Sequence, residues 1–299
     1  MGSPQIVVVG STNTDLVVTV PRIPRPGETV LGGDLRHVAG GKGANQAVAA
    51  SRLGGSVLFI GRIGQDEYGR QAVLSLQAED IDARYLLVTP GVASGIALIS
   101  IQAGSGENSI VVAPGANSAL CPADITNASE AIQAAQVLVV SLEIPQETVQ
   151  AAISLARGKG RLIILNPAPA RALPIELLAQ VDVLTPNEKE LEMLGGSSVL
   201  LAAGVGTVVT TLGSRGARIE TLRGMSLIPA PPVTAIDTVA AGDCFTGALA
   251  VELGQGTEID KAVRFAVAAA SLKVTRQGAQ AGMPTRDEVT RFLSRLNET

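Results

Sequence analysis

Residues 237–243 (DTVAAGD) combine a carboxylate with a run of small residues directly before a predicted helix, Phe245–Leu253. The first N–H groups of a helix have no backbone partner, and the helix dipole favours negative charge at that end. Asp243 beside such a cradle can take a proton from a hydroxyl while the amides hold charge on a transferring group, which is phosphoryl transfer to an alcohol. The alternative is an aspartate that serves only as a helix cap.

A second motif, residues 40–50 (GGKGANQAVAA), places two glycines before a predicted helix that ends at Leu53. Glycine lets a ligand approach the backbone closely. Lys42 and Asn45 are three residues apart and project from the same helical face, which suits the hydroxyls of a polyol. The alternative is a glycine turn followed by a solvated lysine.

Two further motifs lie at the ends of predicted elements. In residues 185–190 (TPNEKE), Asn187 and Glu190 lie one turn apart at a predicted helix start. Taken alone, this spacing predicts a capping box, and a metal site is the alternative that the resemblance described below implies. Residues 211–216 (TLGSRG) form a glycine-rich turn after a strand, which suits backbone approach to phosphate. The chain has no GxxxxGK[ST] loop, so ATP would not bind in that manner.

Taken together in this order, motifs 40–50 and 237–243 resemble the two signatures of the ribokinase and phosphofructokinase-B type of carbohydrate kinase. The resemblance runs from about Val7 to Gly282. It implies ATP-dependent phosphorylation of D-ribose at its 5-hydroxyl, with Mg²⁺ and an activating K⁺.

The resemblance also implies a role for each matching residue. It assigns catalysis to Asp243 as general base and to Ala240, Ala241 and Gly242 as an anion hole. It assigns binding of the sugar to Asn13, Asp15, Gly40, Gly41, Lys42, Asn45, Glu143 and Asp243. It assigns binding of ATP to Asn187, Thr211, Leu212, Gly213, Ser214, Arg215, Gly216 and Gly242, and binding of Mg²⁺ through water to Glu190. It assigns binding of K⁺, mostly through backbone carbonyls, to Asp237, Val239, Lys273, Arg276, Gly278 and Gly282.

Three positions depart from the family pattern. Gly282 lacks the hydroxyl of the serine that ribokinases often carry there, so it can offer K⁺ no side-chain oxygen. Val267 stands where a histidine often lies near the adenine. Residues 196–205 are shorter than the usual connection, which tends to include another full helix.

Composition restricts the class of protein. The 299 residues are 46% hydrophobic and 17% charged, which predicts a globular chain with a large core. A net charge of −4 and six aromatic residues argue against a nucleic-acid partner. Cys121 and Cys244 are far apart and fit a reduced compartment, the cytoplasm. No apolar run is long enough to predict a membrane span.

Apolar runs that alternate with helical patterns predict one domain, residues 1–299, built on a doubly wound, mostly parallel sheet flanked by helices. Strands are expected at 5–10, 57–61, 137–142, 161–165, 181–184, 206–212, 217–222 and 225–229. Helices are expected at 40–53, 69–79, 122–134, 146–157, 175–179, 187–194, 245–253, 258–275 and 286–296. Short strands at 16–20, 29–31 and 35–38 and a hairpin of 95–102 with 108–113 predict a small β-sheet lid, about 14–39 and 95–113.

Polar side chains follow the predicted strands and should converge at the carboxyl edge of the sheet, where ligands bind in open parallel sheets. They are Asn13, Asp15, Asp66, Glu143, Asn166, Asn187, Glu190 and Thr211, with Gly213. Asp243 is expected to lie over the same cleft.

Other functions remain as rivals to a ribose kinase. The nearest is a kinase for another small sugar or a nucleoside. An NAD-dependent oxidoreductase would share the doubly wound sheet, but residues 10–14 lack the GxGxxG turn after the first strand. A sugar-binding protein without catalysis would not need Asp243 and its cradle. Exposed strand edges in the lid predict pairing with a second copy as a homodimer.

Overall fold

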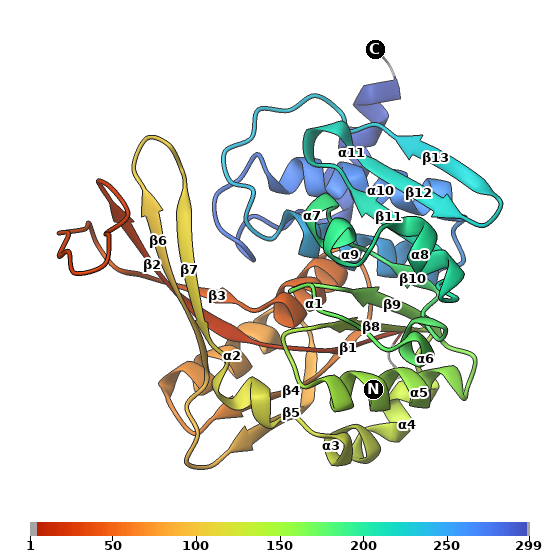
Figure 1. The fold of residues 1–299 in the computed structure, drawn as a ribbon, viewed down its shortest axis with the longest axis horizontal. Coiled ribbons are helices and arrows are strands. Elements are labelled where there is room, and N and C mark those ends of the chain that lie inside the picture. The colour runs from red at the N-terminus through yellow and green to blue at the C-terminus, as the bar shows by residue number, and fades with distance from the viewer. Residues whose placement is uncertain (1–4, 298–299) are drawn as a thin grey trace.

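The computed structural model describes residues 5–297 and contains two separate sheets (Figure 1). The ends of the predicted 1–299 domain, residues 1–4 and 298–299, lie outside the described part. The large sheet has nine strands and the small one four. Among the described residues no helix is both long and apolar enough to span a bilayer.

The large sheet runs in the order β13-β12-β11-β10-β9-β8-β1-β4-β5. Its strands are β1 (Ile6–Val9), β4 (Val57–Gly64), β5 (Asp82–Thr89), β8 (Val137–Ser141), β9 (Leu162–Asn166), β10 (Val183–Leu184), β11 (Thr207–Thr211), β12 (Ala217–Thr221) and β13 (Gly224–Ile228). Strands from β11 to β5 are parallel, and β12 and β13 are antiparallel. The central strands β1 and β8 are buried along their whole length, as expected for apolar runs covered on both faces.

Helices cover both faces of this sheet. They are α1 (Lys42–Arg52), α2 (Glu67–Ala78), α3 (Pro122–Asn127), α4 (Ser129–Ala134), α5 (Gln146–Arg157), α6 (Ile175–Leu178), α7 (Glu188–Met193), α8 (Ser197–Ala202), α9 (Ala241–Gly254), α10 (Ile259–Lys273) and α11 (Arg286–Asn297). Helices α1, α2, α9, α10 and α11 pack into one apolar cluster, and α3 to α8 pack into a second. This is the doubly wound arrangement that the sequence predicts.

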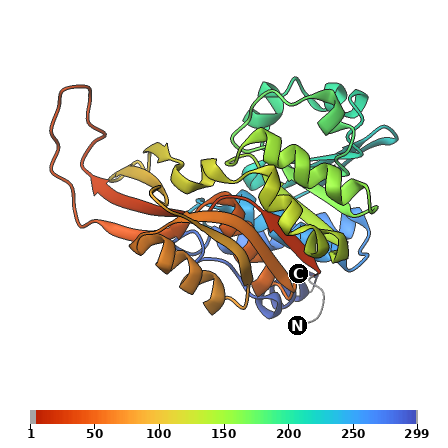
Figure 2. The ribbon, with the colours of Figure 1, turned by 90° about the horizontal axis from the view of Figure 1, so that it is seen from below.

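The small sheet stands away from the body of the molecule (Figure 1). It contains β2 (Asn13–Val20), β3 (Arg36–Gly40), β6 (Gly95–Gln102) and β7 (Asn108–Ala113), in the order β3-β2-β6-β7. The connection 21–35 between β2 and β3 projects beyond the other elements, as Figure 2 shows.

The strand order reverses at β1 and β8, although these two strands are parallel. From β1 the chain continues to β4 and β5 on one side, whereas β8 and the later strands lie on the other. Such a reversal opens a crevice at the carboxyl ends of the two strands, where ligands bind in open α/β sheets. The side chain of Ser11, just after β1, donates a hydrogen bond across it to Glu143, just after β8, at 2.5 Å.

Helices α1 and α9 touch through their backbones. A Cβ at Gly247 in α9 would lie 2.6 Å from the carbonyl oxygen of Gln46 and 2.7 Å from the Cβ of Ala49, both in α1. Only glycine permits this approach. The contact fixes the two helices that carry residues 40–50 and 237–243.

Most predicted elements are found, and the differences have local causes. Residues 29–31 form no strand and are mostly exposed. Strand β5 was not predicted, because as an edge strand it is only partly buried and lacks a continuous apolar run. The expected helix 122–134 is two helices that meet at Ala128. The connection 196–205 does contain a helix, the six-residue α8.

We predict that Gly247→Ala lowers the free energy of unfolding by about 1–3 kcal/mol, because the added methyl group overpacks the α1–α9 contact. Gly158→Ala is the matched control, since its Cβ would meet nothing closer than 3.5 Å. Urea denaturation of both variants measures the two effects. Equal effects of the two substitutions would contradict the packing argument.

Candidate active site

The carboxylate of Asp243 is buried and held by two side-chain amides. Asn45 Nδ2 donates to Asp243 Oδ2 at 2.9 Å, and Gln46 Nε2 donates to Asp243 Oδ1 at 3.2 Å. Both donors lie in α1, and Asp243 lies in the first turn of α9. The α1–α9 contact therefore sets the orientation of this carboxylate.

A second set of contacts orients the two amides. Gln280 Nε2 donates to Asn45 Oδ1 at 3.2 Å, and Gln46 Nε2 also donates to Asn166 Oδ1 at 3.2 Å. Asn166, at the end of β9, in turn donates to the carbonyl of Thr185 at 2.8 Å. Neither Gln46 nor Gln280 is among the predicted site residues. Gln46 lies inside the 40–50 motif, and its position beside Asn45 is the signal that could have identified it.

The predicted cradle begins at Ala240, which has φ 59° and caps α9. A positive φ is unusual for a residue with a Cβ and is found most often at functional sites. The N–H of Ala241 donates to Thr238 O at 3.2 Å, while those of Gly242 and Asp243 find no acceptor within residues 5–297. No atom lies within 4 Å of the position that a Cβ on Gly242 would take, so there is open space beside this residue.

Three of the residues predicted to bind the sugar, Asp15, Lys42 and Glu143, influence one another through their charges. Asp15 packs against Gly40, where a Cβ would lie 2.4 Å from its carboxylate oxygens. Glu143 Oε2 accepts from the backbone N–H of Lys42 at 3.0 Å. Burial, followed by the charges of Glu143 and Asp243, raises the pKa of Asp15 to about 7. The charge of Asp243, with that of Glu143, raises the pKa of Lys42.

Asn13 is fixed by a residue that the sequence analysis did not assign. Asn117 Nδ2 donates to Asn13 Oδ1 at 2.7 Å, and Asn117 Oδ1 accepts from Thr12 N at 3.0 Å. A Cβ at Gly95 would lie 2.2 Å from both Asn117 Nδ2 and Asn13 Oδ1. This arrangement leaves the Nδ2 of Asn13 as the donor for a ligand.

Asp66, one of the polar residues expected at the carboxyl edge of the sheet, has a different role. Asp66 caps α2 by accepting from Gly69 N at 2.8 Å, and it also accepts from the backbone N–H of Ser94 at 2.7 Å. Its place after β4 is correct, but its oxygens hold the start of α2. The expectation that Asp66 faces the cleft is therefore wrong.

A cleft of about 710 Å³ opens beside the N-terminus of α9. Five of the predicted nucleotide residues line it, namely Thr211, Gly213, Ser214, Gly216 and Gly242. Apolar side chains from residues 230–235 and from α10 form much of the remaining wall, and Val267 is among them. The cleft thus joins an apolar slot to the free amides.

Three predicted nucleotide residues are not among those that line this cleft. Leu212 is buried and its N–H donates to Gly216 O at 2.8 Å. Arg215 forms an exposed ion pair with Glu188. Asn187 caps α7 by accepting from the N–H of Glu190.

Asn187 and Glu190 form the capping box that the sequence offered as the alternative to a metal site. Asn187 N donates to Glu190 Oε2 at 2.8 Å, and Glu190 N donates to Asn187 Oδ1 at 2.9 Å. Burial raises the pKa of Glu190, and the charge of Lys42 opposes this shift. Within residues 5–297 no group of three or more Cys, His, Asp or Glu could hold a metal alone. A single free oxygen, Glu190 Oε1, fits a Mg²⁺ ion that keeps its waters.

In the predicted K⁺ loop, the side chain of Lys273 lies where a cation was expected. Asp237 Oδ1 accepts from Val239 N at 3.0 Å, and Asp237 Oδ2 accepts from Gly278 N at 2.8 Å. The Nζ of Lys273 donates to the backbone oxygen of Asp237 at 2.9 Å. Burial lowers the pKa of Lys273, and Asp237 opposes this shift. The resemblance implied ligands that are mostly backbone carbonyls, and it did not predict the position of this ammonium group.

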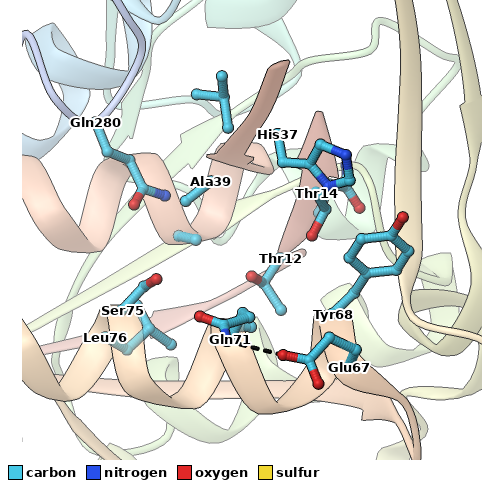
Figure 3. A pocket seen from close by; sticks show the side chains of 14 residues that line it. Thr12, Thr14, His37, Ala39, Glu67, Tyr68, Gln71, Ser75, Leu76 and Gln280 are labelled. Carbon is cyan, nitrogen blue, oxygen red and sulfur yellow. Dashed lines mark hydrogen bonds between the residues drawn. The ribbon is translucent and has the colours of Figure 1, made fainter. Parts of the chain in front are cut away.

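A second cavity, of about 360 Å³, lies behind β2, between α1 and α2 (Figure 3). Thr12, Ser75 and Gln280 line it, and the ring of Tyr68 lies 6.0 Å from that of His37 at one side. Successive side chains of a strand point to opposite faces, so Thr14 faces this cavity and Asp15 faces away from it. Gln280 connects the cavity wall to Asn45.

A family model described as pfkB family carbohydrate kinase matches residues 3–286. The chain belongs to this family. It is therefore a carbohydrate kinase, and the resemblance stated from motifs 40–50 and 237–243 is confirmed, as is the predicted fold class.

Individual relatives of this kinase match along almost the whole chain. A ribokinase from Bacillus subtilis (strain 168) is 44% identical over 292 residues, 97% of this chain and 99% of that protein. A deoxyribokinase from Salmonella typhi is 36% identical over 306 residues, 98% of this chain and 99% of that protein. Arabidopsis thaliana ribokinase complexed with ribose and ATP has a TM-score of 0.90 at 32% identity, covering 98% of this chain and 99% of that one.

We predict that the stability of the kinase depends on pH through Asp15. Its pKa is about 7 in the folded state against an ordinary value of 3.8, so the folded state holds an extra proton between these limits. The stability contributed by protonated Asp15 is present below about pH 4 and is lost as the pH rises through 7. The free energy of unfolding of wild type relative to Asp15→Asn should therefore fall over this interval.

Urea titrations at a series of pH values measure this difference. The control is Asp287→Asn, which changes an exposed carboxylate in the first turn of α11. Its difference from wild type over the same pH series gives the baseline for removing an exposed carboxylate. A difference for Asp15→Asn that does not fall between pH 4 and 7 would contradict the raised pKa of Asp15.

Proposed function

We propose that this kinase transfers the γ-phosphoryl group of ATP to the 5-hydroxyl of D-ribose, in the cytoplasm. The observation that carries the proposal is the pairing of a fixed carboxylate, Asp243, with the free amides of Gly242 and Asp243 at the end of an apolar cleft. The Bacillus subtilis ribokinase and the Arabidopsis thaliana complex with ribose and ATP support the choice of substrates.

Ribose would bind between the small sheet and α1. Asp15 and Glu143 offer acceptors for its hydroxyls, and Lys42 and Asn13 offer donors. Hydroxyl donors would replace water around Asp15 and favour its ionised form. The small sheet would cover the sugar as a lid, in line with the predicted lid segments 14–39 and 95–113.

Asp243 would act as the general base. The 5-hydroxyl loses its proton to the carboxylate, its oxygen forms a bond to the γ-phosphorus, and the bond from that phosphorus to the bridging oxygen of ADP breaks. The free amides of Gly242 and Asp243 would stabilise the negative charge on the transferring group. Glu190 would hold Mg²⁺ through water, and the ion would neutralise charge on the phosphates.

ATP would lie in the cleft with its adenine against the apolar wall that includes Val267. The ribose and phosphates of ATP would be contacted by backbone atoms of Thr211, Gly213, Ser214 and Gly216. Asn187 would reach the phosphates only by giving up part of its capping role.

A second substrate is supported by a specific finding, the 36% identity to a deoxyribokinase along the whole chain. The alternative is therefore a kinase for another small sugar of the same class, such as 2-deoxy-D-ribose. The ratio of kcat/KM for the two sugars, read from ADP release, decides between them.

We also propose that two copies associate through the small sheet. Leu98 on β6 and Val111 on β7 are opposite each other in the register and are both exposed on one face of the sheet, whereas Ile110 and Val112 are exposed on the other face. Exposed apolar side chains that pair on one face of a sheet are candidates for an interaction surface. A second copy of the same sheet would cover it.

We predict that Asp243→Asn lowers kcat by roughly 10²- to 10⁴-fold, because it removes the general base. Affinity for D-ribose, measured by calorimetry, should change little, because the other sugar ligands remain. Asp287→Asn is the control and should keep full turnover in a coupled ADP-release assay. Near-normal turnover of Asp243→Asn would remove Asp243 as the base.

We predict that Val111→Glu shifts the chain toward monomer in sedimentation velocity, because a charge beside Leu98 on the exposed face of the sheet resists burial. Ser105→Glu, at the exposed tip between β6 and β7, is the control and should leave the association state unchanged. An unchanged sedimentation coefficient for Val111→Glu would place the interface elsewhere.

A further inference from the structure

Lys273 has a side chain that is completely buried, although lysine is rarely buried without a partner. It is the last residue of α10. An ammonium group removed from water is strongly disfavoured unless nearby oxygens compensate for the lost hydration. The groups around Nζ therefore explain why a lysine is tolerated here.

The ammonium group lies between the two segments that the family resemblance gives to K⁺. Its Nζ is 2.9 Å from the backbone oxygen of Asp237 and 4.0 Å from Asp237 Oδ1. The carboxylate of Asp237 joins both segments, since it accepts from Val239 N on one and from Gly278 N on the other. A positive charge thus sits where carbonyl and carboxylate oxygens gather.

Gly282 makes room for this lysine. A Cβ at Gly282 would lie 3.3 Å from Lys273 Cε, 3.3 Å from Arg276 O and 2.7 Å from Gly278 O. The serine that ribokinases often carry at this position would therefore compete with the end of Lys273 for the same space. The absence of a side chain at 282 and the buried lysine at 273 are therefore linked by packing.

We infer that the ammonium group of Lys273 is a built-in replacement for the activating potassium ion, so that this kinase works without a monovalent cation. A K⁺ ion on the same oxygens would lie next to a like charge, and the side-chain oxygen of a serine is missing. The donor set therefore does not fit K⁺, and the expected K⁺ site is withdrawn.

The proposed role of Lys273 is to position the anion cradle. Asp237 begins the segment that leads to Ala240, whose positive φ must be held by its surroundings. The inference rests on the proposal that the amides of Gly242 and Asp243 hold the developing charge. Lys273 touches no reacting atom in this scheme, so it acts through the segment that it anchors.

The first experiment compares wild type in potassium chloride and in choline chloride of equal ionic strength. We expect the same kcat with D-ribose and ATP and the same melting temperature in both salts. A rise of about tenfold or more in kcat with potassium, or a higher melting temperature, would overturn the inference. If D-ribose is not turned over in either salt, the proposed substrate is wrong, and the melting temperatures still decide the cation question.

The second experiment restores the expected site. Lys273→Ala should lose roughly 10- to 100-fold in kcat in choline chloride, with a smaller change in KM for the sugar, because the cradle is misplaced. Lys273→Ala combined with Gly282→Ser should recover turnover in potassium but not in choline, and crystals soaked in Rb⁺ should show the ion beside Asp237. Potassium-independent turnover of the double variant would contradict the inference.

A matched control is available on the same helix. Lys261→Met removes a lysine whose side chain is 75% exposed and which pairs with Glu258 at 3.2 Å. It should behave as wild type in both salts. If Lys273→Ala does not fold, the wild-type salt comparison still tests the inference.

Discussion

The site depends on one interaction, the pair of amide donors that hold the carboxylate of Asp243. Both donors come from neighbouring residues of α1, and the carboxylate comes from α9. Their distance is set by the backbone contact at Gly247, where no side chain separates the helices. Motifs 40–50 and 237–243 are thus held together both by packing and by hydrogen bonds.

Much of the site could be predicted because its parts are contiguous motifs. Asp243, Asn45 and the glycine turn at 213–216 each lie within a short pattern whose chemistry can be read from spacing. Gln280 and Asn117 could not be found in this way, because their partners are distant in the sequence. The position of the Lys273 ammonium group also depends on packing, since the same residue could have offered only its carbonyl.

The fold shows the same division between local and distant information. The buried parallel strands are continuous apolar runs, so β1, β8 and β9 were predicted within one or two residues. Strand β5 has mixed burial at the edge of the sheet and gave no such run. Residues 29–31 have the composition of a strand but no neighbouring strand to pair with in the described structure. Pairing partners, unlike propensity, are set by tertiary structure.

The cavity behind β2 has a consequence for how the rate of this kinase can change over evolution. Gln280 lines that cavity and also bonds Asn45, which bonds Asp243, so two hydrogen bonds connect the far wall to the carboxylate of Asp243. Ser75 and Gln71 line the same cavity, so substitutions there would alter the surroundings of Gln280. Selection therefore has a route to this carboxylate through positions that belong to none of the predicted motifs.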